Sequence, residues 1–217
     1  ADTVAGWAPG AQPLRMPKGL AQRLAPGGDF ILEVHYHPSG KAASDRSALA
    51  LYFAKEPVER YTEGLVIGTE NIDIPPGESE YVRHVWMELP SAVELIDVNP
   101  HMHFLGRDVD AVALLPDGGE LDLIRIRGYD FRWQNTYVYR EPVHLPKGTR
   151  LDVTMSFDNS AANPANPSAP PIRVKEGWQT TDEMCLFYFT IVPRKPAEMD
   201  AVYGAMIAAF TRSGAPE

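Results

Sequence analysis

The sequence is poor in the features that mark several common classes of protein. Cys185 is the only cysteine in 217 residues, so no disulfide can form within the chain and cysteine content does not indicate the redox compartment. Apolar runs such as residues 111–115 and 201–210 are too short or too broken to cross a bilayer. The net charge is −9 and no run of lysine or arginine occurs, which argues against a nucleic-acid-binding surface. No GxSxG motif supports a serine nucleophile.

Turn residues divide the chain into short apolar segments, and the sequence has 20 prolines and 17 glycines. Ten segments are rich in β-branched or aromatic residues and often alternate apolar and polar positions, which is typical of strands. They are residues 30–37, 48–53, 64–72, 80–89, 93–98, 109–115, 121–126, 136–143, 150–157 and 183–192. Turn sequences such as IPPGE (74–78) and LPKGT (145–149) lie between them. The pattern predicts an all-β protein, an antiparallel β-sandwich or jelly roll.

Three segments lie outside the strand pattern. Residues 1–28 are rich in proline and glycine and are expected to form a connector. The polar loop 158–171 is long for a compact domain, and we expect it to be a mobile flap near the functional site. We expect residues 45–195 to form one jelly-roll domain and residues 196–217 to form a partly helical tail.

Two of the six histidines stand one residue apart, in NPHMHFLG (99–106). Alternate residues of a strand share a face, so His101 and His103 are predicted to project side by side. Such a pair can hold a metal ion, although a bare His-x-His motif is equally compatible with two surface histidines. His35 and His37 form a second pair of the same kind. His84 and His144 have no histidine partner nearby in the sequence and are left unassigned.

Met184 lies where the polar part of TTDEMCLFYF (180–189) gives way to an apolar strand. A methionine in a strand is normally core filler. A thioether is also a soft ligand that suits Cu(I) and is hardly ever used for zinc. Two histidines and this methionine would therefore make a copper site that can cycle between oxidation states. Cys185, inside the apolar strand, is expected to be a buried and inert thiol.

Six motifs together resemble the copper type II, ascorbate-dependent monooxygenases, the family of peptidylglycine α-hydroxylating and dopamine β-monooxygenases. They occur in the family's order over about 180 residues and look most like those of bacterial homologues. They are WAPGAQPLRMPKG (7–19), LEVHYH (32–37), IPPGE (74–78), HMHFLG (101–106), LPKGT (145–149) and TDEMC (181–185).

The resemblance implies a role for particular residues. It implies that His101, His103 and Met184 hold the copper at which oxygen binds and a C–H bond of a small-molecule substrate is hydroxylated. It implies that His35 is one of three ligands of a second, electron-transferring copper, and that Tyr188 contacts the substrate. Ascorbate or another one-electron donor would be the reductant, and the complete catalytic unit would hold two copper ions.

The chain also departs from the family pattern. It has no adjacent His-His pair, which in the family supplies the other two ligands of the second copper. Residues 1–44 are therefore expected to be a connector and the last strands of a missing N-terminal copper domain, and one copper is expected in this chain. Where the peptide-hydroxylating member of the family has an arginine that binds the substrate carboxylate, this chain has Asn99. A glycine-extended peptide is therefore not expected to be its substrate. We expect an extracytoplasmic protein, periplasmic or secreted, whose export signal lies outside this sequence. The alternative is a non-catalytic copper-binding sandwich, a carrier or an interaction module.

Overall fold

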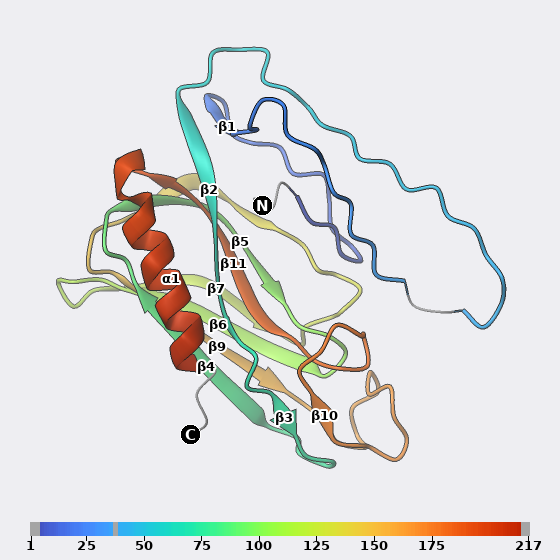
Figure 1. Cartoon of the computed structure of the whole chain (residues 1–217). Coiled ribbons are helices and arrows are strands. Elements are labelled where there is room, and N and C mark those ends of the chain that lie inside the picture. The colour runs from blue at the N-terminus through green and yellow to red at the C-terminus, as the bar shows by residue number, and fades with distance from the viewer. Residues whose placement is uncertain (1–4, 37–38, 214–217) are drawn as a thin grey trace.

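The computed structural model describes residues 5–36 and 39–213, and it shows two β-sheets packed face to face (Figure 1). The strands are β1 (Leu20–Gln22), β2 (Arg60–Thr69), β3 (Asp73–Ile74), β4 (Tyr81–Glu88), β5 (Val93–His101), β6 (Gly106–Leu114), β7 (Glu120–Arg127), β8 (Tyr137–Leu145), β9 (Arg150–Phe157), β10 (Val174–Lys175) and β11 (Cys185–Pro193). The helices are the 3-10 turn η1 (Pro196–Glu198) and α1 (Met199–Ser213). None of the helices in the described part of the chain combines the length and apolar character needed to span a bilayer.

One sheet has the strand order β1-β2-β11-β5-β8 and the other has the order β4-β9-β6-β7. Neighbouring strands are antiparallel in both, except that β1 runs parallel to the start of β2. The short strands β10 and β3 form a separate ribbon. The prediction of an all-β antiparallel sandwich is confirmed, and eight of the ten predicted strand segments overlap strands β2, β4 to β9 and β11.

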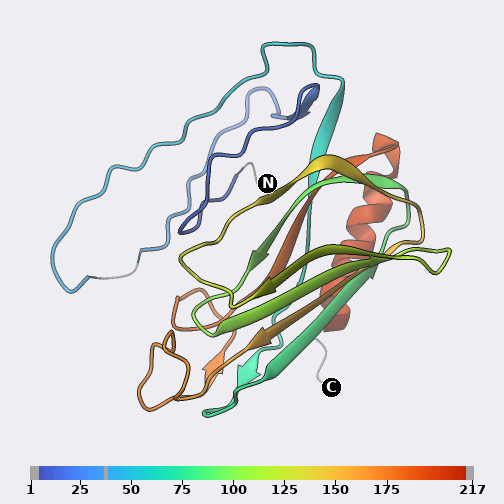
Figure 2. The ribbon, with the colours of Figure 1, turned by 180° about the vertical axis from the view of Figure 1, so that it is seen from behind.

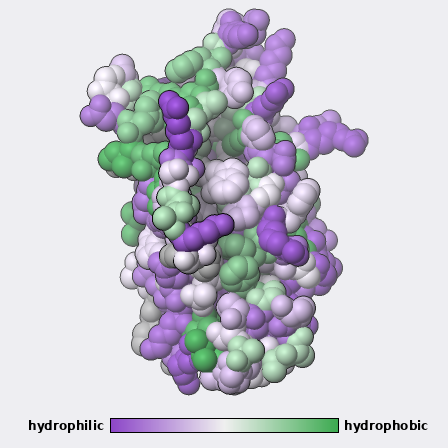
Figure 3. All heavy atoms as spheres, turned by 90° about the vertical axis from the view of Figure 1, so that its right-hand side faces the viewer, coloured by the Kyte–Doolittle hydropathy of each residue, from purple (hydrophilic) through white to green (hydrophobic). Residues whose placement is uncertain are grey.

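The other two predicted strands do not form. Residues 30–36 and 48–53 belong to an extended segment, here called the strap (residues 23–36 and 39–59), which loops away from the sandwich (Figures 1 and 2). The prediction was wrong because alternation of side chains does not supply a neighbouring strand, and a strand needs such a partner for its backbone hydrogen bonds. Large apolar side chains of the strap are consequently exposed: Phe30, Ile31, Leu32, Val34, Tyr36, Leu49, Tyr52 and Phe53. Apolar patches are visible on this side of the surface in Figure 3.

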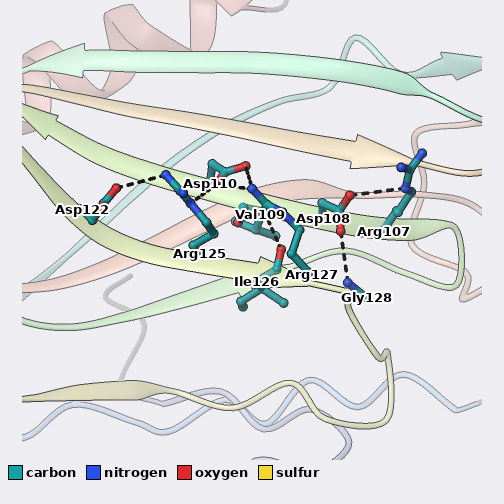
Figure 4. Close-up of polar contacts among 9 residues, drawn as sticks. All are labelled: Arg107, Asp108, Val109, Asp110, Asp122, Arg125, Ile126, Arg127 and Gly128. Atoms are coloured by element: carbon teal, nitrogen blue, oxygen red, sulfur yellow. Dashed lines mark hydrogen bonds and ion pairs between the residues drawn. The ribbon is translucent and has the colours of Figure 1, made fainter.

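The period-two pattern is clear in strand β6, which pairs with β7. Val109 and Ala111 point into the core and are fully buried. On the opposite face, the Asp110 carboxylate pairs with Arg125 at 2.8 Å and with Arg127 at 2.9 Å (Figure 4). Exposed ion pairs of this kind add little stability, so burial of the inner face accounts for the position of these strands.

Helix α1 runs along the edge of β2 that faces away from β11 (Figure 1). The backbone N–H of Val66 lies 3.4 Å from the Met206 sulfur, and the Ser213 hydroxyl donates to the Gly68 carbonyl at 2.6 Å. The Thr69 hydroxyl in turn donates to the Ser213 carbonyl at 2.7 Å. The helix therefore covers backbone groups that would otherwise be open to solvent at the edge of the sheet.

The loop 158–171, expected to be mobile, is held by a dense set of hydrogen bonds. Asn159 is fully buried at its start, and the Asn163 amide donates to the Asp158 carbonyl at 2.7 Å. The Asn166 amide donates to the Asn159 side-chain oxygen at 2.9 Å. These contacts argue against a freely mobile flap, because each asparagine replaces solvent with a fixed partner.

One end of the sandwich gathers the segments that carry the candidate ligands. There β5 ends at His101 and the chain crosses at residues 102–105 to β6 in the other sheet. Strand β11 begins at the same end, because Leu186 pairs with His101.

Candidate metal centre

The two histidines of the HMH motif lie at the corner between β5 and β6. His101 is the last residue of β5, and His103 follows the end of that strand instead of continuing it. Their rings are 5.2 Å apart between centroids and nearly perpendicular, at 87°. Met102, between them, is completely buried in the core. The pair therefore projects from a corner whose position is fixed by the packing of the intervening side chain.

Each imidazole is oriented by a hydrogen bond through the same ring nitrogen. The Nδ1 of His101 lies 2.6 Å from the Gln134 side-chain oxygen, and the Nδ1 of His103 lies 3.1 Å from the Asp182 backbone carbonyl. Since a carbonyl oxygen only accepts, the neutral rings carry their proton on Nδ1 and leave the Nε2 lone pair available. Partners of this kind fix the tautomer of metal-binding histidines.

Burial also favours the neutral form of both rings. It lowers the pKa of His101 to about 4, with a further lowering from the neighbouring charge of His103. The pKa of His103 is lowered as well, chiefly by burial. A metal ion requires unprotonated imidazole, so both side chains are ready to bind one at neutral pH.

Met184 is brought to this corner by the pairing of β11 with β5. It lies two residues before Leu186, the partner of His101, and only 8% of its surface is exposed. The Oε2 atom of Glu183 accepts hydrogen bonds from the backbone N–H groups of both His103, at 2.8 Å, and Met184, at 3.1 Å. The backbones of two candidate ligands therefore converge on one oxygen atom.

The sequence motifs assigned no role to Glu183, yet its side chain is completely buried. Its Oε1 atom also accepts from the Leu105 N–H at 2.6 Å. Burial raises the pKa of Glu183 to about 8, while the three backbone hydrogen bonds act in the opposite direction. No spacing rule links residue 183 to residues 103–105, so sequence reasoning could not find this contact.

The loop after β7 braces the same corner and was also missed from the sequence. The Tyr129 hydroxyl donates to the Met102 carbonyl at 3.0 Å. The Phe131 ring packs against His103, with centroids 5.9 Å apart, and Gln134 holds His101. The aromatic and amide-rich composition of GYDFRWQNT (128–136) is the only signal that could have pointed to it.

A cavity of about 220 Å³ borders Met184. Tyr188 lines it, and so does Trp178, which is 65% exposed. The complete lining is Val66, Thr69, Glu70, Glu176, Trp178, Met184, Cys185, Leu186, Tyr188 and Phe210. The cavity is thus mostly apolar, with two carboxylates and no arginine or lysine in its wall.

Three of the remaining histidines have partners other than the HMH pair. His35, on the strap, is half exposed, its Nε2 is 2.7 Å from Glu33, and its ring contacts the edge of Trp178 at 5.2 Å. His84 pairs with Asp152, and His144 lies 3.8 Å from a carboxylate oxygen of Glu94. His37 lies outside the described residues.

The donor atoms at the corner fit a copper ion better than a hard cation. Within residues 5–36 and 39–213, no group of three or more His, Cys, Asp or Glu side chains is placed to hold a metal ion. Two neutral imidazoles together with the thioether of Met184 would form a mixed nitrogen and sulfur set, which suits copper. Cys185 does not compete as a ligand, because it is buried in the core and burial raises the pKa of its thiol to about 12.

The structure is a β-sandwich with a candidate histidine-based metal centre at this corner, and comparison with known sequences identifies its family. Residues 64–201 match the family described as copper type II ascorbate-dependent monooxygenase, C-terminal domain. The chain belongs to this family.

Two curated relatives are similar over nearly the whole chain. MOXD1 homolog 1 of Drosophila melanogaster is 28% identical over 92% of the chain, and peptidyl-glycine alpha-amidating monooxygenase of Mus musculus is 25% identical over 100%. The chain spans only 29% and 21% of the lengths of these two relatives.

Proposed function

We propose that this chain is the C-terminal half of a copper monooxygenase unit, in which His101, His103 and Met184 hold the catalytic copper. The convergence at the β5–β6 corner carries the proposal: two imidazoles held through Nδ1, and a methionine whose N–H shares a carboxylate oxygen with His103. When bound, copper supplies the one-electron chemistry by which O2 and an external reductant hydroxylate a C–H bond.

The chain's own residues orient and tune the site. Gln134 and the Asp182 carbonyl hold the imidazole protons on Nδ1, so the Nε2 atom of each ring is the one with a lone pair for a metal ion. The thioether of Met184 favours the Cu(I) state over Cu(II). The core packing of the corner fixes the separation of the donors before any ion arrives, which lowers the cost of binding.

The apolar cavity beside Met184 is the proposed substrate site. Tyr188 lines the cavity and pairs with Asn99 across β11 and β5, on the same sheet face as His101. The Asn99 amide donates to Thr136 at 3.2 Å and presents no positive charge. Because no cation lines the cavity, we propose an apolar substrate that lacks a carboxylate. Binding of a carboxylate compound as tightly as its carboxamide would contradict this part of the proposal.

Residues 1–44 are proposed to be a connector and the last strands of a preceding copper domain, and residues 45–195 the catalytic jelly roll. The exposed apolar side chains of residues 30–36 support this division, because they have no partner surface within the described residues. His35 is then one ligand of a second copper whose other ligands come from that domain. An extracytoplasmic location, with ascorbate or another one-electron donor as reductant, belongs to the same proposal.

A pair of matched methionine variants tests the copper assignment. Met184→Leu keeps the side-chain volume and removes the sulfur, so we expect Cu(I) affinity to fall by at least about tenfold. The two imidazoles serve both oxidation states, so Cu(II) affinity should change by much less. Competition titrations with chelators specific for each state measure both values. Met87→Leu makes the same chemical change at a buried site in β4 and serves as the control. Equal losses for Cu(I) and Cu(II) in the Met184 variant would refute the ligand assignment.

Metal analysis and oxygen uptake test the division of the catalytic unit. These 217 residues should bind one copper tightly and show no coupled, reductant-dependent hydroxylation. A longer chain that includes the preceding domain should restore turnover, whereas robust coupled turnover by the 217 residues would contradict the proposed division.

A further inference from the structure

Glu183 makes an unusual set of contacts for a completely buried carboxyl group. It has no ion pair with any lysine or arginine in the described part of the chain. Its two oxygens accept only backbone hydrogen bonds, from His103 at 2.8 Å, Leu105 at 2.6 Å and Met184 at 3.1 Å. Removing a carboxyl group from water without a cation is unfavourable, so its partners must account for its presence here.

The partners of this carboxyl group all belong to the candidate copper site. Two of the three N–H groups belong to the proposed ligands His103 and Met184, and the third belongs to Leu105 in the same corner. The backbone of Glu183 is itself anchored, because its N–H donates to the Lys175 carbonyl at 3.0 Å and its carbonyl accepts from the Gly177 N–H at 3.2 Å. The side chain thus joins two segments that are almost 80 residues apart in the sequence.

We infer that Glu183 is a positioning residue that holds the His103 corner against Met184, so that imidazole and thioether can bind the same copper ion. The inference rests on the proposed copper site and assigns Glu183 no contact with the metal. The strand pairing of β5 and β11 reaches only to His101 and Leu186, so it does not fix residues 103 and 184 by itself. The Glu183 carboxyl group and the bond from His103 Nδ1 to the Asp182 carbonyl extend the connection beyond the last strand pair.

The test replaces the hydrogen-bond acceptor at residue 183 and measures which atoms are bound to copper. Glu183→Gln has the same size but replaces one acceptor oxygen by an NH2 group, which cannot accept a hydrogen bond from an N–H. X-ray absorption of the Cu(I)-loaded chain measures whether a Cu–S contact is present, and chelator titrations measure affinity for Cu(I) and Cu(II). Glu120→Gln, at an exposed position in β7, removes a carboxylate elsewhere and is the control.

We expect wild type and the Glu120 variant to show two imidazole nitrogens and one sulfur around Cu(I). The Glu183→Gln variant should lose the sulfur contact and bind Cu(I) about 10–100-fold more weakly, the range found for residues that orient metal ligands. Its Cu(II) affinity should change less, because His101 remains held by Gln134. A folded Glu183→Gln protein that keeps the sulfur contact and the ratio of Cu(I) to Cu(II) affinity would overturn the inference, even if its melting temperature fell.

Wild type itself provides the separate test of the underlying site. Absence of sulfur in the wild-type spectrum would refute the copper proposal and this inference with it, whereas its loss only in the variant supports both. If Glu183→Gln does not fold, Glu183→Asp keeps both oxygens and withdraws them by one methylene. That variant should also bind Cu(I) more weakly relative to Cu(II), and an unchanged ratio together with a retained Cu–S contact would overturn the inference.

Discussion

Substitution of Asn159 should reveal how firmly the loop 158–171 is fixed. The Asn159 amide is completely buried, and its nitrogen lies 3.3 Å from the Ile74 carbonyl, 2.9 Å from that of Pro75 and 2.8 Å from that of Ile172. Its oxygen accepts from Asn166 at 2.9 Å. An amide nitrogen has only two protons, so the three contacts of the nitrogen count as about two donated hydrogen bonds. With the bond that the oxygen accepts, the side chain makes about three hydrogen bonds.

The expected effect of Asn159→Ala follows from this count. With about 1–1.5 kcal/mol for each hydrogen bond, the variant should lose about 3–4.5 kcal/mol of unfolding free energy. For a domain of this size that corresponds to a fall in melting temperature of about 6–18 °C. Asn159→Asp should be at least as damaging, because it places an oxygen opposite three carbonyl oxygens.

Thermal and denaturant unfolding of the variants measures these losses. Asn163→Ala is the matched control, because Asn163 is only half-buried and its side chain makes a single donated and a single accepted bond. Because the accepted bond is exposed to solvent, only the donated bond should count, and the variant should lose about 1–1.5 kcal/mol. The reasoning would be refuted by a loss below about 1 kcal/mol for Asn159→Ala, or by an Asp variant as stable as wild type.

Two further substitutions probe buried polar groups. Burial raises the pKa of Asp97, opposed by its hydrogen bond with Thr190, and its Oδ2 has no hydrogen-bond partner in the described structure. The native state therefore loses stability as the pH rises above about 3.9, the value in an unfolded chain, towards the raised native pKa. Asp97→Asn should be more stable than wild type at pH 7 and lose that advantage near pH 4 in denaturant titrations, and an advantage independent of pH would count against this account. Gln134→Ala should release the His101 ring and weaken copper binding about 10–100-fold in chelator competition, and unchanged affinity would show that this hydrogen bond does not orient the ligand.

Different features of the sequence predicted the strands and pointed to two parts of the candidate metal site. Alternation identified β4 to β9 because each of these segments has one face in the core. The same alternation in residues 30–36 was misleading, since the pattern describes side-chain faces and not the presence of a partner strand. Strands β3 and β10 are two residues long and carry no periodic signal.

The HMH motif could be identified because its two histidines are neighbours in the sequence, and Met184 could be identified because it lies in a motif of the resembling family. Glu183 and Gln134 could not be identified in this way, because their importance depends on contacts with residues 103 and 101 that only the packed sandwich creates. Local sequence therefore indicated which atoms could bind a metal. It did not indicate which side chains hold those atoms in place.

The position of helix α1 affects whether two copies of the chain can associate through their sheets. Residues 64, 66 and 68 of β2 would otherwise present free backbone groups along a sheet edge, a template on which a second molecule could add a strand. Because the helix covers this edge with Met206 and Ser213, two copies cannot join their sheets there. Loss of the C-terminal helix would thus open a route to intermolecular β-pairing and precipitation, even though the HMH corner contains no residue of α1.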